Sequence, residues 1–144
     1  MDWYYPVLSG VVTGDQGKSI LSEKAELFIM EDMGIRCVSD QPWVTTAETC
    51  ECSIAYLVVG DNQKAESLFR WSQFMRQSDG HYLTGLVHPE KQSFPENEKT
   101  TYSAAAVILA ADAISQSSPA SGIFTNRAGL PEIISTEEHI LDPD

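Results

Sequence analysis

The 144-residue chain is poor in basic residues. Lys and Arg number 9 against 21 Asp and Glu, which gives a net charge of −12, and no basic cluster interrupts the acidic background. Proteins that bind a phosphate backbone concentrate Lys and Arg on one face. Nucleic acid is therefore not an expected partner.

Long apolar runs are also absent. The longest candidate, residues 104–111, is much shorter than the roughly 18 residues that a membrane-spanning helix needs. The first residues, Met1 to Pro6, contain no basic segment followed by an apolar run, so no secretory signal is visible. We expect a cytoplasmic protein without a membrane span.

Cysteine is scarce and odd in number, which predicts reduced thiols rather than a disulfide scaffold. Cys50 and Cys52 are two residues apart in a predicted helix, so they face different directions. The sequence contains no Cys-x-x-Cys or His-x-x-x-His spacing, no Gly-rich phosphate loop and no nucleophile elbow. We expect neither a metal nor a cofactor.

Helical patterns dominate what is present. Residues 46–59 and 101–114 are apolar on nearly every side, which is typical of helices in the interior of a protein. Residues 61–77 and 16–31 carry one apolar face and predict helices of an outer layer. A short inner helix is expected over 5–12, with a proline near its first turn.

Inner and outer helices alternate, which predicts an all-α fold of stacked helical hairpins in two layers. Long connections, 32–45 and 78–99, lead into the two long inner helices, so both should open onto one rim, and long loops often carry function. The alternative is a plain helical bundle whose loops carry none. We expect one domain over residues 1–125 and an acidic C-terminal tail over 126–144.

A specific motif lies over residues 73–82, where a predicted outer helix ends in Gln, an Asp-Gly turn and an aromatic residue. This motif resembles the repeat of α/α-toroid proteins. Four blocks, 1–8, 34–45, 47–51 and 100–113, resemble the C-terminal half of bacterial toroid proteins described as prenyltransferase-like or squalene-cyclase-like, in the superfamily of the six-hairpin glycosidases.

The resemblance covers about residues 1–125 and implies a partial α/α toroid with about half of the full ring. In such a fold the first and last inner helices expose apolar flanks. The implied partners are a second copy of the chain, in a homo-oligomer, or a missing toroid half.

Carboxylates and aromatic residues are interleaved in the predicted rim. Sugar hydrolysis needs one protonated and one ionised acid, and aromatic rings stack on sugar faces. The catalytic candidates are Asp2, Asp40 and Glu48. The substrate-binding candidates are Trp3, Tyr4, Tyr5, Arg36, Trp43, His81, Tyr82 and Tyr102, with Arg36 suited to grip a carboxylate or an anionic substrate.

Several of these residues have a structural interpretation as well. Glu48 follows Thr45 by three positions, the spacing of a helix capping box. Asp40 is placed to pair with Arg36 or to cap the turn before Pro42.

The aromatic run 3–5 is equally suited to filling the inner layer, and loop histidines such as His81 are usually solvated. Both interpretations stay open beside the functional ones.

Three functional hypotheses follow. The first is a rim that binds a carbohydrate or a glycosylated intermediate, with acid–base hydrolysis by two of the three candidate carboxylates. The second is a noncatalytic helical module that self-associates. The third is an isoprenoid-binding relative of the prenyltransferases and terpenoid cyclases. Whether the chain is an enzyme at all, glycosidase-like or prenyltransferase-like, stays open.

Overall fold

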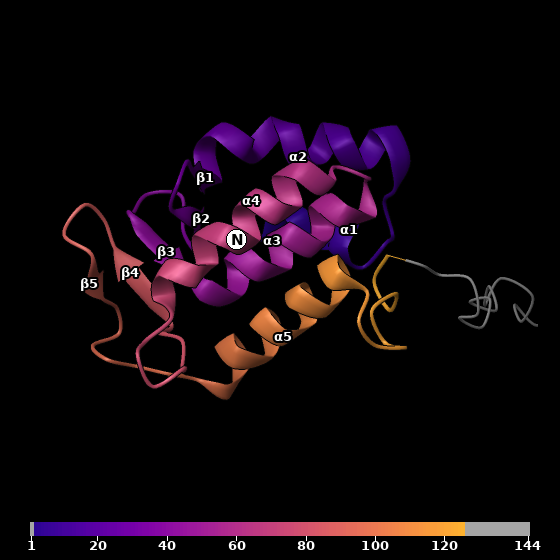
Figure 1. Cartoon of the computed structure of the whole chain (residues 1–144). Helices are drawn as coiled ribbons and strands as arrows, with labels where there is room; N and C mark the ends of the chain where they lie inside the picture. The colour runs from indigo at the N-terminus through magenta and orange to yellow at the C-terminus, as the bar shows by residue number, and fades with distance from the viewer. Residues whose placement is uncertain (1, 126–144) are drawn as a thin grey trace, which may run out of the picture.

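The computed structural model describes residues 2–125 (Figure 1). The elements follow along the chain in the order η1 (Asp2–Tyr4), α1 (Tyr5–Leu8), α2 (Gly14–Phe28), β1 (Ile29–Met30), β2 (Gly34–Arg36), β3 (Trp43–Thr45), α3 (Thr46–Val58), α4 (Asn62–Ser72), η2 (Gln73–Met75), β4 (Gly85–Val87), β5 (Gln92–Ser93) and α5 (Thr101–Ser115). The predicted acidic tail, 126–144, lies outside the described residues, and the domain over 1–125 stays a prediction.

Helix α3 is the centre of the molecule. It packs against α4, α5, α1 and strand β2, and nine of its residues are buried. Figure 1 shows α2 above it and α5 below it. The all-round apolar pattern of 46–59 therefore predicts both the helix and its central position correctly.

The other predicted helices are also present, with shifted ends. Helix α4 follows Gly60, which adopts a φ of +80°, and Asp61 caps it by accepting a hydrogen bond from the Lys64 backbone N–H at 3.0 Å. Helix α5 begins after Thr100, whose hydroxyl accepts from the Ser103 backbone N–H at 3.1 Å. The polar residues that precede these helices thus set where they start.

The prediction of an all-α fold is wrong. Five short strands form one antiparallel sheet in the order β1-β2-β3-β4-β5, and the sheet lies at one end of the molecule (Figure 1). The chain is an α+β protein, and it is not a toroid of helical hairpins alone. The alternative of a plain helical bundle is wrong for the same reason.

The strands cannot be predicted from the sequence because they are only two or three residues long. A period-2 alternation needs about four to eight residues to be recognised. All but one of the strands, β1, lie in the connections 32–45 and 78–99, whose Gly, Pro, Asp and Ser residues are typical of loops.

The sheet nevertheless brings the two long connections together. Strand β3 from the first connection pairs with β4 from the second, in the register Trp43 to Val87, Val44 to Leu86 and Thr45 to Gly85. The expectation that both connections meet is therefore confirmed. Strand β3 runs directly into α3, so the sheet fixes the position of the first turn of that helix.

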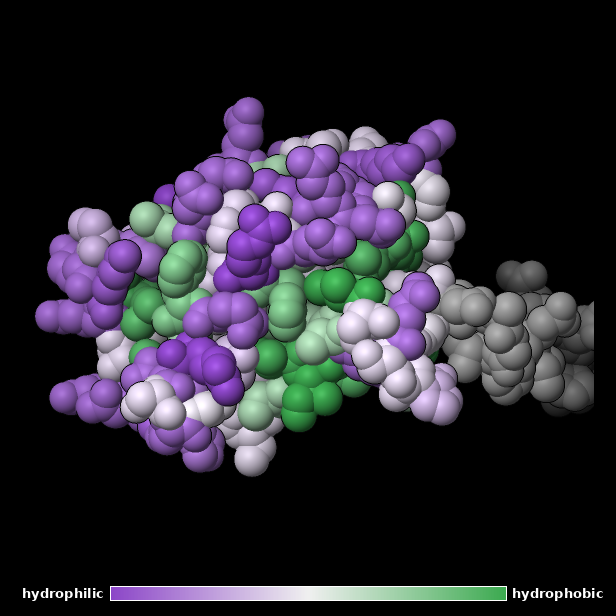
Figure 2. Space-filling view, in the orientation of Figure 1, coloured by the Kyte–Doolittle hydropathy of each residue, from purple (hydrophilic) through white to green (hydrophobic). Residues whose placement is uncertain are grey.

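Helix α5 buries only one side. Its outer side exposes Tyr102, Ile108 and Leu109, with Ile108 66% exposed. Figure 2 shows hydrophobic surface over much of the area where α5 lies, beside a mostly hydrophilic surface over α2 and α4.

No helix within residues 2–125 combines the length and the apolar character needed to cross a membrane. The cytoplasmic location stays a prediction.

Strand β2 lies in close contact with α3. The Ile35 N–H donates to Thr49 Oγ1 at 2.9 Å, and that hydroxyl donates to the Thr45 carbonyl at 2.6 Å. A Cβ at Gly34, where φ is +137°, would lie 2.6 Å from Thr49 Oγ1 and 2.8 Å from Val44 Cγ1. Only glycine fits there.

Gly34→Ala should therefore lower the free energy of unfolding by about 3 kcal/mol or more, through overpacking added to backbone strain. Gly60→Ala is the matched control, because Gly60 also has a positive φ but faces open space, and the expected loss there is about 1 kcal/mol. Urea unfolding measures both variants. Equal losses would contradict the close contact between β2 and α3.

Self-association through α5 stays a prediction. We expect light scattering to report a dimer for the unaltered chain and a monomer for Ile108→Glu, because the new charge would be buried between the two copies. Val11→Glu is the control, since Val11 is exposed and lies between α1 and α2. A monomeric unaltered chain at high concentration would contradict the prediction.

Candidate functional site

Three tyrosine hydroxyls converge on one carboxylate. Glu51 Oε2 accepts hydrogen bonds from Tyr4 at 2.7 Å and from Tyr5 at 2.9 Å, and Glu51 Oε1 accepts from Tyr102. The donors come from η1, α1 and α5, and the acceptor lies on the central helix α3. We call these four residues the Glu51 cluster.

The cluster raises the pKa of its tyrosine donors. Burial, followed by the hydrogen bond to Glu51, raises the pKa of the Tyr4 hydroxyl far above its ordinary value. The same causes raise the pKa of Tyr5 and Tyr102. All three phenols therefore stay protonated, and keep donating to Glu51, to a higher pH than an ordinary tyrosine.

Glu48 lies one helical turn before Glu51 on α3 and is half-buried. Side chains three residues apart share one face of a helix, with Cβ atoms about 5–6 Å apart. The negative charge of Glu48 also acts on Tyr4 and Cys37, where it helps to raise the pKa of both groups. Glu48 and Glu51 are thus two neighbouring carboxylates with different surroundings.

The capping-box interpretation of Glu48 is wrong. The Thr45 side chain makes no capping hydrogen bond, and its Oγ1 is buried without a hydrogen-bond partner among the described residues. Glu48 likewise makes no hydrogen bond or ion pair within residues 2–125.

The predicted candidates fall into two groups. Tyr4, Tyr5 and Tyr102 meet at Glu51, and Glu48 lies beside them. Trp3 stacks on Phe28, with ring centroids 5.9 Å apart, and meets the Tyr4 ring edge-on. Trp3 therefore supports the packing of this region, which matches its interpretation as a core residue. Asp2 opens η1, and its side chain is not described.

The second group makes no hydrogen bond, ion pair or ring contact with the Glu51 cluster within residues 2–125. Asp40 is exposed in the turn between β2 and β3 and has no ion pair with Arg36. Arg36 is half-buried on β2, and its Nε has no hydrogen-bond partner in the described part of the chain. Trp43 stacks on Phe94, with ring centroids 4.5 Å apart.

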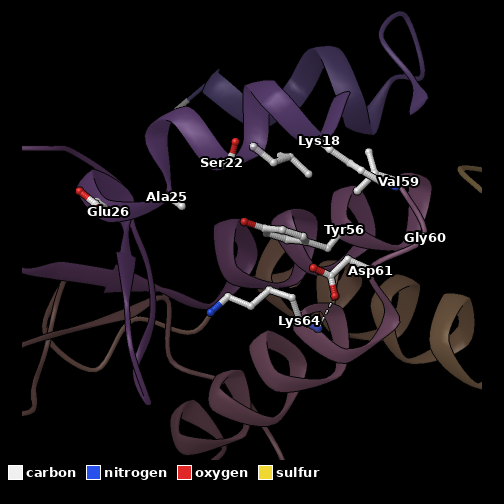
Figure 3. A pocket seen from close by; sticks show the side chains of 10 residues that line it. Lys18, Ser22, Ala25, Glu26, Tyr56, Val59, Gly60, Asp61 and Lys64 are labelled. Atoms are coloured by element: carbon white, nitrogen blue, oxygen red, sulfur yellow. Dashed lines mark hydrogen bonds between the residues drawn. The ribbon is translucent and has the colours of Figure 1, made fainter. Parts of the chain in front are cut away.

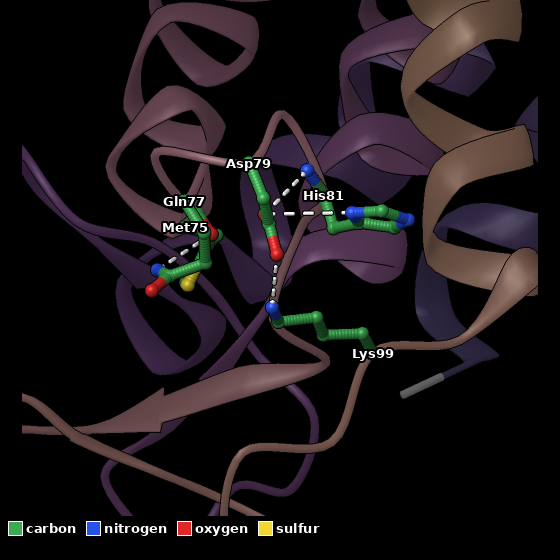
Figure 4. A network of polar contacts seen from close by, with 5 residues as sticks. All are labelled: Met75, Gln77, Asp79, His81 and Lys99. Carbon is green, nitrogen blue, oxygen red and sulfur yellow. Dashed lines mark hydrogen bonds and ion pairs between the residues drawn. The ribbon is translucent and has the colours of Figure 1, made fainter.

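Tyr82 and His81 belong to the turn after η2. The Tyr82 hydroxyl donates to Gln73 Oε1 at 2.6 Å. Gly80 has a φ of +85°, so the expected Asp-Gly turn is confirmed. The exposed His81 faces Asp79 instead of a substrate cleft (Figure 4).

Asp79 fastens this turn to the segment before α5. Asp79 Oδ2 accepts from Lys99 Nζ at 2.6 Å, and Asp79 Oδ1 accepts from the His81 backbone N–H at 3.0 Å (Figure 4). The hydrogen bond from Lys99 is the main reason that the pKa of Asp79 falls to about 2. These exposed contacts order the loop and add little stability.

A hollow of about 680 Å³ lies between α2 and α4, around Tyr56 (Figure 3). Lys64, which lines this hollow, already has partners. Its backbone N–H donates a hydrogen bond to the Asp61 side chain. Its ammonium group forms an ion pair with Glu31 at 3.2 Å and lies 5.0 Å from the centre of the Trp71 ring. We assign no chemistry to this hollow.

The three cysteines are free, as expected. Burial raises the pKa of Cys50 to about 12 and raises that of Cys52 as well, so neither is a nucleophile at neutral pH. Within residues 2–125, no three side chains of His, Cys, Asp or Glu lie together as metal ligands.

Sequence reasoning missed Glu51. A signal was present, because Glu51 is a charged residue between Cys50 and Cys52 in a helix that is predicted to be central, and such a residue is rarely buried without partners. Its spacing of three from Glu48 also placed it on the same helix face.

No family model matches the chain. A search of known proteins found a relative from Mycolicibacterium hassiacum named MMP endo-(1,4)-3-O-methyl-alpha-D-mannosidase. The two sequences are 44% identical over 124 residues, which cover 86% of this chain. The match covers 34% of the relative, so the chain spans about a third of that protein's length.

The assignment to the α/α-toroid proteins is wrong. The five-stranded antiparallel sheet contradicts a fold of helical hairpins alone, and the relative carries the name of a mannosidase and not of a prenyltransferase or cyclase. A missing toroid half was expected as a partner only because of that assignment, so this expectation is withdrawn.

The raised tyrosine pKa values predict a loss of stability at alkaline pH. A tyrosine whose pKa is raised on folding stabilises the folded state below the unfolded pKa of about 10, and this stability is lost as the pH rises further.

Urea unfolding between pH 8 and 11 should show this decline in the free energy of unfolding, and the decline should be smaller in Tyr4→Phe. Tyr82→Phe is the control, because its hydroxyl bonds Gln73 and not Glu51. Equal pH dependence in the two variants would contradict the cluster.

Proposed function

We propose that the chain takes part in the hydrolysis of an α-mannosidic bond in a saccharide of O-methylated mannose, with Glu48 and Glu51 as its catalytic carboxyl groups. The observation that carries this proposal is the pair of neighbouring carboxylates on α3, one of which is fixed by three tyrosines. The name of the relative supports the substrate class.

Glu51 is suited to the role of the ionised carboxylate. An ionised carboxylate offers about four acceptor positions, and the tyrosines occupy three of them. The remaining position is available either to take a proton from water or to attack the anomeric carbon. The three hydrogen bonds hold the group in one orientation, so little reorganisation is needed during the reaction.

Glu48 is suited to the role of the general acid. Its carboxyl group has no partner among the described residues, it is half-buried, and it lies one helical turn from Glu51. A general acid must donate a proton to the glycosidic oxygen as the bond breaks. Glycosidase carboxyl groups lie about 5 to 9.5 Å apart, and neighbouring turns of one helix allow separations in this range.

This proposal changes two of the three catalytic candidates. Asp40 lies in an exposed turn before β3, whereas Glu48 lies in the helix that follows β3, and Asp2 has no described side chain. Glu51 replaces them as the partner of Glu48. Tyr4, Tyr5 and Tyr102, expected to contact substrate, act in this scheme by positioning Glu51.

Glu48→Gln and Glu51→Gln should each lower kcat by about 10²- to 10⁴-fold, because each removes an acid or base that acts in the transition state. The assay follows the release of reducing ends from an α-1,4-linked oligosaccharide of 3-O-methylmannose. Glu66→Gln is the matched control, since Glu66 is exposed on α4, and its kcat should be unchanged.

Unchanged kcat in both α3 variants, in protein that unfolds at the same urea concentration as the unaltered chain, would eliminate the assigned roles. A complete lack of hydrolysis by the unaltered chain would contradict the proposed activity itself.

A further inference from the structure

A second hollow, of about 750 Å³, lies beside the sheet. Neither Glu48 nor Glu51 lines it. Its apolar wall includes Met33, Leu83 and Leu86, of which the two leucines belong to the small hydrophobic cluster under β3 and β4. We call it the sheet hollow. Small-molecule sites are typically hollows of about 300–1,000 Å³ with apolar walls and a few polar groups.

His88 supplies a buried polar group to the sheet hollow. The side chain is only 6% exposed, and its Nδ1 is buried without a hydrogen-bond partner in the described part of the chain. The His88 backbone N–H donates to the Pro42 carbonyl at 3.0 Å, so the residue is held in place. A buried polar atom without a partner is costly in a folded protein.

The His88 ring is suited to bind a hydroxyl group. Burial, helped by the nearby charge of Lys91, lowers the pKa of the imidazole, while Glu90 acts in the opposite direction. The ring is therefore neutral near pH 7, and a neutral imidazole has one nitrogen that donates and one that accepts. A sugar hydroxyl can both give and take a hydrogen bond.

The rim of the sheet hollow stores backbone strain. Asp32, Lys91 and Asn97 line it and adopt φ values of +60°, +55° and +54°. Among residues 2–125, only Gln116 at the end of α5 is another non-glycine residue with positive φ. Strained residues concentrate at functional sites, and here three of them surround one hollow.

An exposed aromatic ring completes the sheet hollow. Phe74 belongs to η2, lines the sheet hollow and is 67% exposed. Aromatic rings of this kind stack on the apolar face of a sugar, and the leucine and methionine wall suits an O-methyl group. The combination favours a ligand that is part polar and part apolar.

We infer that the sheet hollow binds an O-methylated mannose unit, with His88 bonding a hydroxyl and Phe74 stacking on the ring. The choice of this sugar rests on the proposed function. The sheet hollow would hold one part of a long saccharide while the carboxylates on α3 act on another part.

The test uses the full chain and the monosaccharide 3-O-methyl-D-mannose, with D-mannose for comparison. Amide NMR shifts followed by titration should identify residues around 85–88 as the binding site. D-mannose should bind about fourfold more weakly, because it lacks one buried methyl group. His88→Leu should weaken the binding of 3-O-methylmannose about fivefold through the loss of one hydrogen bond.

Phe74→Ala provides a second variant, because an exposed residue can be replaced without loss of the fold. It should weaken binding as well, and the exposed α5 variant Ile108→Ala should not. Equal affinity for the two sugars, shifts that map elsewhere, or unchanged binding by Phe74→Ala would overturn the inference.

The hydrolysis assay is independent of this titration. Binding at the sheet hollow by a chain that does not hydrolyse would support the inference and contradict the proposed function. Hydrolysis without binding at the sheet hollow would overturn the inference and leave the carboxylates on α3 in their roles.

Discussion

One carboxylate that accepts three hydrogen bonds links distant segments of the chain to the central helix. Glu51 lies on the central helix, and its donors come from the beginning of the described chain and from α5, separated from it by 47, 46 and 51 positions in the sequence. A charge inside a folded protein is tolerated only when its hydrogen bonds are satisfied. The cluster therefore requires η1, α1 and α5 to meet at α3, and it leaves Glu48 beside a fixed negative charge.

The sequence predicted the helices well because their patterns are long. Thirteen residues of α3 and fifteen of α5 give repeated evidence of burial or amphipathicity, and Asp61 and Thr100 mark helix starts through their capping chemistry. The sheet was missed because its strands are two or three residues long. Its pairing is set by contacts between distant segments, such as Trp43 with Val87, which no local pattern records.

The candidate site was predicted in part. Tyr4, Tyr5 and Tyr102 do come together near Glu48, because they lie in η1 and in the first turns of α1 and α5, and Glu48 lies in the first turn of α3, against which α1 and α5 pack. Glu51 was overlooked although it organises the group. Asp40, Trp43 and His81 were grouped with them from their loop positions alone, and loop position does not fix direction. In the structure, Trp43 stacks on Phe94, and His81 contacts Asp79 and not the Glu51 cluster.

The central proposal is that Glu48 and Glu51 lie on either side of the α-mannosidic bond that is hydrolysed. The most direct measurement is a crystal structure of the Glu48→Gln variant with an α-1,4-linked 3-O-methylmannose oligosaccharide bound. We predict that a glycosidic oxygen lies within hydrogen-bond distance of the amide at position 48, with the Glu51 carboxylate facing the anomeric carbon and still bonded to its three tyrosines. An oligosaccharide that contacts neither residue would contradict the claim.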